Sequence, residues 1–183
     1  MPSTRIRGAR DLVVADFDFD LRMDSAAIVD QQIVITRPAF AKSADETASR
    51  ITLSCGDGFE QLVAVDLDDD VDLKSKDPSK CYPSADPDLI VFGSAGIKLF
   101  ENRASAPGSE REFVERPTGD AMNALRNVRA VVPADLDLDG DLDFLTLTSE
   151  GVRLWSNRGN WTFEDITARS LLPPAEFSPT AAV

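Results

Sequence analysis

The sequence predicts an all-β fold made of about three repeats of one small unit. Two similarities within the 183 residues indicate the repeat. An aspartate-rich stretch occurs three times, at residues 16–24, 66–72 and 135–143. The segment Gly96–Arg103 also matches the segment Gly151–Arg158 almost position for position. Because the second similarity is independent of the first, an accidental repeat is a poor explanation.

Each aspartate-rich stretch follows a short apolar or β-branched segment, as expected for a loop that a strand enters. The third repeat shows the pattern most clearly, with strands expected at 127–134, 144–148, 152–157 and 161–167. The intervening turns at 149–151 and 158–160 are short and rich in hairpin residues. Four antiparallel strands per repeat are typical of a β-propeller blade.

The other two repeats give four strands each with less regular spacing. The strands expected in the second repeat are 61–65, 89–93, 97–102 and 112–117, with an insertion at 73–87. Those expected in the first are 12–15, 25–29, 33–37 and 50–55, with a long loop at 38–49. Residues 1–183 are therefore expected to form one partial propeller, with repeats at about 10–60, 61–126 and 127–178 and the start of a further blade at 179–183.

The third aspartate-rich loop has the composition of a calcium site, because Ca²⁺ takes six to eight oxygen ligands. Side-chain oxygens would come from Asp135, Asp137, Asp139 and Asp143. Asp141 would offer its carbonyl, and Gly140 lies where the chain must turn sharply. If the carboxylates converge, each like-charge pair at about 4 Å costs roughly 4 kcal/mol, which a cation would offset. The alternative is a solvated loop whose carboxylates point apart.

This loop differs from an EF-hand, which needs a bidentate Glu at position twelve, where Thr146 stands. The first loop keeps the acidic residues Asp16, Asp18, Asp20 and Asp24. Leu21 replaces the glycine there, so the turn must adopt another geometry or accept strain of about 1–3 kcal/mol.

The second loop departs further from the pattern. Its acidic residues are Asp66, Asp68, Asp70 and Asp72. Val71 replaces the glycine, and Lys74 occupies position nine, where an ammonium group would repel a cation. Asp88, which follows the insertion, is the expected substitute.

Composition excludes several classes of function. The formal charge of −13 disfavours nucleic acid and anionic membranes as partners. The absence of histidine removes the commonest general base and transition-metal ligand. No apolar run approaches a membrane span, and the N-terminus lacks the apolar core of an intact signal peptide. Spacing alone does not decide whether Cys55 and Cys81 form a disulfide.

These residues resemble the FG-GAP (VCBS-type) repeat family, which forms the β-propeller heads of integrin α-subunits and of many bacterial surface or secreted proteins. The resemblance covers nearly the whole chain. In that family the motif Asp-x-Asp-x-Asp-Gly-x-x-Asp joins the first two strands of a blade and binds Ca²⁺, and residues 135–143 match it fully. The segment 163–167, Phe-Glu-Asp-Ile-Thr, resembles the end of such repeats.

The resemblance implies a non-enzymatic calcium-binding module for protein–protein or adhesive contact, located outside the cytoplasm. Open blade edges suggest self-association as a second kind of partner. The alternatives are a calcium-dependent enzyme acting on polysaccharides and a lectin-like propeller that binds carbohydrate. Trp155 and Trp161 would suit a sugar if they were exposed, although their places in strands favour packing between blades.

Overall fold

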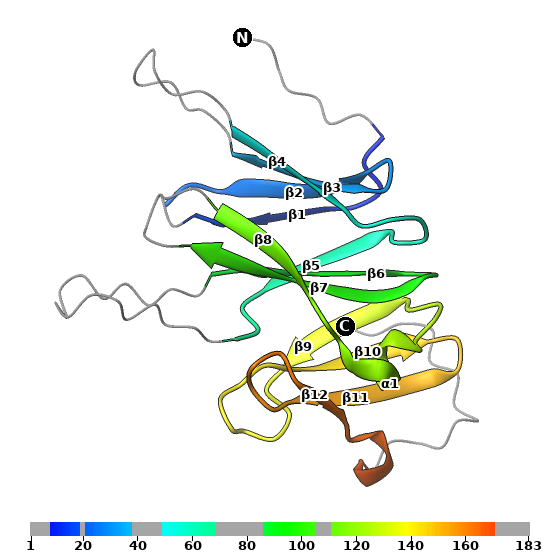
Figure 1. The fold of residues 1–183 in the computed structure, drawn as a ribbon. Helices are drawn as coiled ribbons and strands as arrows, with labels where there is room; N and C mark the ends of the chain where they lie inside the picture. Colours follow the sequence, from blue (N-terminus) through cyan, green and yellow to red (C-terminus); the bar gives the residue numbers. More distant parts are fainter. Residues whose placement is uncertain (1–7, 19–20, 38–48, 69–85, 105–110, 171–183) are drawn as a thin grey trace, which may run out of the picture.

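The computed structural model describes residues 8–18, 21–37, 49–68, 86–104 and 111–170, and these form three four-stranded antiparallel sheets (Figure 1). The first sheet contains β1 (Leu12–Ala15), β2 (Asp24–Val29), β3 (Gln32–Arg37) and β4 (Ser49–Ser54). The second contains β5 (Gln61–Val65), β6 (Asp88–Gly93), β7 (Gly96–Ala104) and β8 (Arg111–Arg116). The third contains β9 (Ala130–Ala134), β10 (Asp143–Thr148), β11 (Gly151–Asn157) and β12 (Phe163–Asp165). Strands follow chain order in every sheet, which confirms the predicted all-β fold of blade-like repeats.

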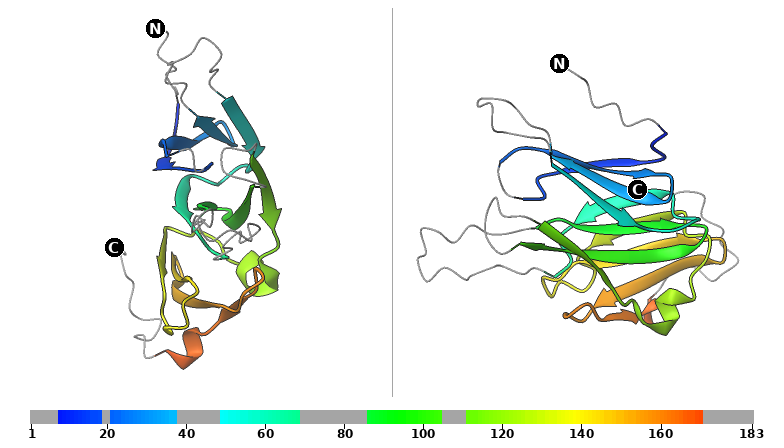
Figure 2. Two further views of the ribbon diagram at one scale, coloured as in Figure 1. Left: turned by 90° about the vertical axis from the view of Figure 1, so that its left-hand side faces the viewer. Right: turned by 45° about the horizontal axis from the view of Figure 1, so that its top comes forward.

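The sheets stack face to face, as the two views in Figure 2 show, and bury one apolar cluster in each seam. Strand β6 is buried on both faces because its side chains alternate between the seams. Leu89 and Val91 pack against the first sheet, whereas Ile90 and Phe92 pack toward the third. We refer to the three sheets as blades.

Two short helices were not predicted: α1 (Gly119–Asn123), which leads from the second blade to the third, and the 3₁₀ turn η2 (Thr167–Arg169). The strand predicted at 127–134 begins only at Ala130, because the N–H groups of Asn127 and Val128 donate to the second blade instead. The strand predicted at 161–167 is shortened at both ends. No helix in the described part of the chain is long and apolar enough to cross a membrane.

The tryptophans pack between blades rather than forming an exposed aromatic surface. Trp155 is 1% exposed in the seam between the second and third blades, and its indole N–H donates to Thr146 Oγ1 at 3.0 Å. Trp161 packs against the same cluster, with the Arg116 guanidinium 5.8 Å from its ring centroid. Cys55, directly after β4, is a buried free thiol, and burial raises its pKa. Cys81 lies outside the described residues.

The glycines that begin β7 and β11 give a matched test of how closely the second blade meets the segment that follows α1. Gly96 and Gly151 have φ of 125° and 123°, so alanine is strained at both. Only at Gly96 would a Cβ lie 2.7 Å from the Leu125 carbonyl oxygen, because nothing approaches within 4 Å of the other. Gly96→Ala should therefore lower the free energy of unfolding by about 1–3 kcal/mol more than Gly151→Ala does. Urea denaturation measures both, and equal losses would refute the close contact.

Candidate functional site

The three acidic loops occupy the same place in each blade, between the first and second strands. Antiparallel pairing sets the last aspartate of each loop opposite the residue that precedes the first one: Ala15 pairs with Asp24, Val65 with Asp88 and Ala134 with Asp143. The two ends of each loop therefore meet. Carboxylate oxygens within 4.8 Å of one another come from Asp16, Asp18 and Asp24, from Asp66, Asp68 and Asp88, and from Asp135, Asp137 and Asp143.

The last aspartate of each group is buried and anchored by the backbone. Its Oδ2 accepts the N–H of the second loop residue, from Phe17 to Asp24 at 3.2 Å, from Leu67 to Asp88 at 2.8 Å and from Leu136 to Asp143 at 2.9 Å. In the second and third blades, Oδ1 also accepts a backbone N–H at 2.8 Å, from Asn102 and Asn157 respectively. These carboxylates are thus fixed in position before any ligand arrives.

The first aspartate of two loops carries a buried oxygen that lacks a protein donor. Oδ1 of Asp16 and Oδ1 of Asp135 are both buried, and no hydrogen-bond donor in the described part of the chain reaches either atom. A buried polar atom without a partner is costly. Both oxygens belong to converging carboxylate groups, and an all-oxygen donor set is what a hard cation requires. The residues present therefore fit Ca²⁺.

Electrostatics in the second loop point the same way. The pKa of Asp88 is raised to about 9, chiefly by burial and also by the nearby Asp68 and Asp66, although the N–H groups of Asn102 and Leu67 oppose the shift. Three converging carboxylates therefore lack enough positive charge around them to keep all three ionised. A divalent cation would supply that charge.

The loops differ in the arginines that lie beside them. Arg37 Nε is 2.8 Å from Asp18 Oδ2 in the first loop, whereas Arg158 is 3.5 Å from Asp137 Oδ2 in the third. The first loop also has Leu21 where the third loop has a glycine. Leu21 adopts the strained left-handed conformation, with φ of 65°, and donates its N–H to Asp16 Oδ2 at 2.9 Å. A cation in the first loop would have to compete with the Arg37 guanidinium.

Of the other predicted ligands, the structure describes Asp139 and Asp141, and neither belongs to the three carboxylate groups. Asp139 is exposed, and its Oδ1 accepts the N–H of Asp141 at 3.0 Å within the turn. Asp20, Asp70 and Asp72 fall outside the described residues. The contributions of these aspartates to cation binding stay predictions.

Sequence reasoning assigned no role to Asn102, Asn157 and Arg37, which all contact the loops. The repeated Asn-Arg pair at 102–103 and 157–158 could have indicated a role for the two asparagines. It lies within the segments whose similarity indicated the repeat.

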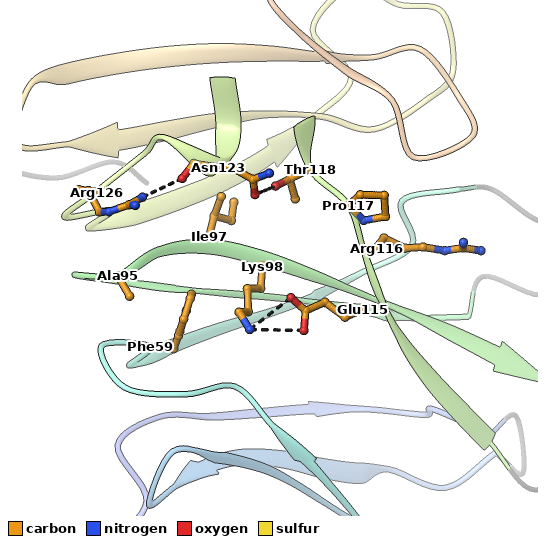
Figure 3. Close-up of a pocket in the computed structure, with 10 residues that line it drawn as sticks. All are labelled: Phe59, Ala95, Ile97, Lys98, Glu115, Arg116, Pro117, Thr118, Asn123 and Arg126. Carbon is orange, nitrogen blue, oxygen red and sulfur yellow. Dashed lines mark hydrogen bonds and ion pairs between the residues drawn. The ribbon is translucent and has the colours of Figure 1, made fainter. Parts of the chain in front are cut away.

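A pocket of about 520 Å³ lies at the end of the second blade opposite its acidic loop, beside the β6–β7 turn and the segment after β8 (Figure 3). Its charged and polar groups are largely engaged with one another. Lys98 pairs with Glu115 at 3.2 Å, Thr118 donates to Asn123 at 2.5 Å, and Arg126 donates to the Asn123 carbonyl at 2.7 Å. Because these groups already have partners, the pocket does not indicate a particular ligand. The acidic loops are the stronger candidate for the functional site.

Comparison with known proteins identifies a repeat family for the C-terminal part of the chain. Residues 135–183 match the FG-GAP-like repeat family, which confirms the resemblance seen in the sequence. The chain is similar to a lectin from Agrocybe aegerita, described as specifically recognising non-reducing terminal N-acetylglucosamine. The identity is 19%, the TM-score is 0.48, and the match covers 82% of this chain and 36% of the lectin chain. The search of curated proteins gave no match.

Proposed function

We propose that this chain, which carries an FG-GAP-like repeat at residues 135–183, is a non-enzymatic module whose acidic loops bind Ca²⁺, one ion for each blade. One observation carries the proposal: the same group of three converging carboxylates is built three times at the same place in the repeat. Oxygen donors without histidine or thiolate favour Ca²⁺ over zinc or iron. The carboxylates that would serve an enzyme as acid and base are the same groups that would bind the ion.

The bound ion would neutralise the loops and hold the first and second strands of each blade together. Asp135, Asp137 and Asp143 would hold it in the third blade, with Asp66, Asp68 and Asp88 in the second and Asp16, Asp18 and Asp24 in the first. A rigid stack of blades is suited to presenting surfaces for protein–protein or adhesive contact. Following the family resemblance, we place this role outside the cytoplasm.

Isothermal titration calorimetry tests the proposal directly. Ca²⁺ should give saturable binding, with Kd of about 10⁻⁴–10⁻³ M as in extracellular modules. Mg²⁺ should bind poorly, because it demands a smaller octahedral shell and keeps its waters. No saturable Ca²⁺ binding up to several times that range would overturn the proposal. Submicromolar binding would instead contradict the placement outside the cytoplasm.

Removing the arginine that competes at the first loop should strengthen calcium binding there. Arg37→Gln deletes the positive charge 2.8 Å from Asp18 Oδ2. We expect the affinity of the first loop for Ca²⁺ to rise about three- to tenfold, since nearby charges of the same sign oppose one another at close range. The backbone amide of Phe17, bonded to Asp24, reports this loop in an NMR titration. An unchanged or weaker affinity would show that Arg37 does not compete with the ion.

The outer face of the first blade offers a surface for self-association. Leu12 and Val14 on β1 are 52% and 58% exposed. The matching residue of the second blade, Leu62, is buried against the first blade. We therefore expect the outer face of the first blade, at β1, to pack against a blade of a second copy of the chain. Light scattering at high concentration should show a larger species that Leu12→Gln with Val14→Gln converts to monomer; a monomeric unaltered chain would contradict this.

A further inference from the structure

Asn102 and Asn157 hold the same position in the third strand of neighbouring blades. Phe100 pairs with Leu89 and Trp155 pairs with Phe144, and each asparagine lies two residues beyond that pair. Both are almost fully buried, at 2% and 1% exposed. Buried amides carry several donors and acceptors that need partners, so their contacts are informative.

Asn157 connects two different acidic loops. Its backbone N–H donates to Asp143 Oδ1 of the third loop at 2.8 Å. Its side-chain amide donates to the carbonyl of Leu67 in the second loop, 90 positions earlier, at 2.7 Å. The same amide nitrogen reaches the Leu142 carbonyl at 3.2 Å, and the side-chain oxygen accepts the N–H of Gly159 at 3.0 Å. These contacts fix the orientation of the amide.

Asn102 repeats the donor contacts of this arrangement one blade earlier. Its backbone N–H donates to Asp88 Oδ1 at 2.8 Å. Its amide donates to the carbonyl of Phe17 in the first loop at 3.0 Å and to that of Pro87 at 3.2 Å. The corresponding position of the first repeat is Pro38, which has neither a backbone N–H nor a side-chain amide.

Together the two asparagines complete a continuous hydrogen-bonded path through the three loops. Leu67 accepts from Asn157 through its carbonyl and donates its N–H to Asp88. Asp88 then accepts from Asn102, whose amide reaches Phe17, and the Phe17 N–H donates to Asp24. The path therefore runs from Asp143 to Asp24. It includes the anchored carboxylate of every loop.

We propose that Asn102 and Asn157 are positioning residues that join each acidic loop to that of the preceding blade, so that ordering one loop strengthens cation binding at the other. The cation part of this inference rests on the proposed function. Binding free energies are reciprocal, so the coupling operates in both directions. The second loop is connected by both asparagines, so its affinity for the cation should depend on them most.

Alanine substitution of each asparagine tests the two connections between loops one at a time. It removes the side-chain amide and keeps the backbone N–H that donates to the aspartate. The probe is Ca²⁺ added to the intact chain and followed by NMR. The backbone amides of Phe17, Leu67 and Leu136 each bond to a carboxylate of a different loop and report it separately. Asn123→Ala on α1 is the matched control, since Asn123 contacts Thr118 rather than a loop.

Asn157→Ala should weaken Ca²⁺ binding about two- to tenfold at the third loop and also at the second, and leave the first nearly unchanged. Asn102→Ala should weaken the second and first loops and spare the third. A residue with only a local structural role would affect its own loop alone, and that result would overturn the proposal. Equal weakening at all three loops would also overturn it. If the alanine variant fails to fold, Asn157→Ser and Asn102→Ser replace it with the same expected pattern.

Hydrogen exchange in the presence of a chelator tests the hydrogen-bonded connections between the loops when no ion is bound. The Leu67 amide should exchange faster in Asn157→Ala than in the unaltered chain or in Asn123→Ala, and unchanged exchange would refute the connection. If the unaltered chain binds no Ca²⁺, the proposed function fails, and the exchange result alone decides whether the asparagines connect the loops.

Discussion

Saturating Ca²⁺ should raise the midpoint of thermal unfolding of the intact chain well above its value in chelator. An ion that binds only the folded loops adds about 2.7 kcal/mol for each site at a hundred times Kd. For a chain of this size, that corresponds to roughly 5–10 °C for each occupied loop. The effect should be large because the loops carry buried carboxylate oxygens that no donor among the described residues reaches, and an aspartate whose pKa is raised to about 9. Calorimetric scans with and without the ion measure it.

General screening of the charge of −13 is the competing explanation for any stabilisation. Mg²⁺ at the same concentration, and NaCl at the same ionic strength, should reproduce only a small part of the shift. Equal shifts in Mg²⁺ and Ca²⁺ would show that the acidic loops screen charge and form no selective site. An unchanged midpoint in Ca²⁺ would contradict cation binding altogether.

The parts of the fold that the sequence predicted are those governed by local pattern. Strand positions followed from short apolar runs between turns, and the predicted strand at 61–65 has the bounds of β5. Asp88 was identified as a loop residue despite the insertion before it, because it directly precedes an apolar strand. The structure does place Asp88 beside Asp66 and Asp68.

The parts that were missed depend on contacts between distant segments. Asn102 reaches Phe17 across 85 positions, and no local pattern contains that pair. Helix α1 covers the seam between two blades with Met122, so its place follows from packing that the sequence does not display. The arginine beside the first loop, Arg37, comes from a neighbouring strand, β3. Its effect on the loop is visible only once the strands are paired.

Asp143→Asn and Asp137→Asn should separate the structural role of the third loop from its role in binding. Asp143 is fully buried and accepts N–H groups on both oxygens, from Leu136 at 2.9 Å and Asn157 at 2.8 Å. An amide keeps one acceptor and turns an NH₂ group toward a donor. We expect Asp143→Asn to lower the free energy of unfolding by about 2–4 kcal/mol even in chelator. It should also abolish Ca²⁺ binding at this loop.

Asp137 provides the matched comparison, because its side chain is 35% exposed and its contacts include a Ser156 hydroxyl at 3.2 Å and Arg158 at 3.5 Å. Asp137→Asn should change stability in chelator by no more than about 0.5 kcal/mol, as is usual for exposed sites. In Ca²⁺ it should lose most of the stabilisation due to the third loop, since one of three converging carboxylates is gone. Urea denaturation of both variants with and without Ca²⁺ measures all four values. Equal losses of the two variants in chelator would refute the structural role of Asp143, and full calcium stabilisation of Asp137→Asn would refute the site.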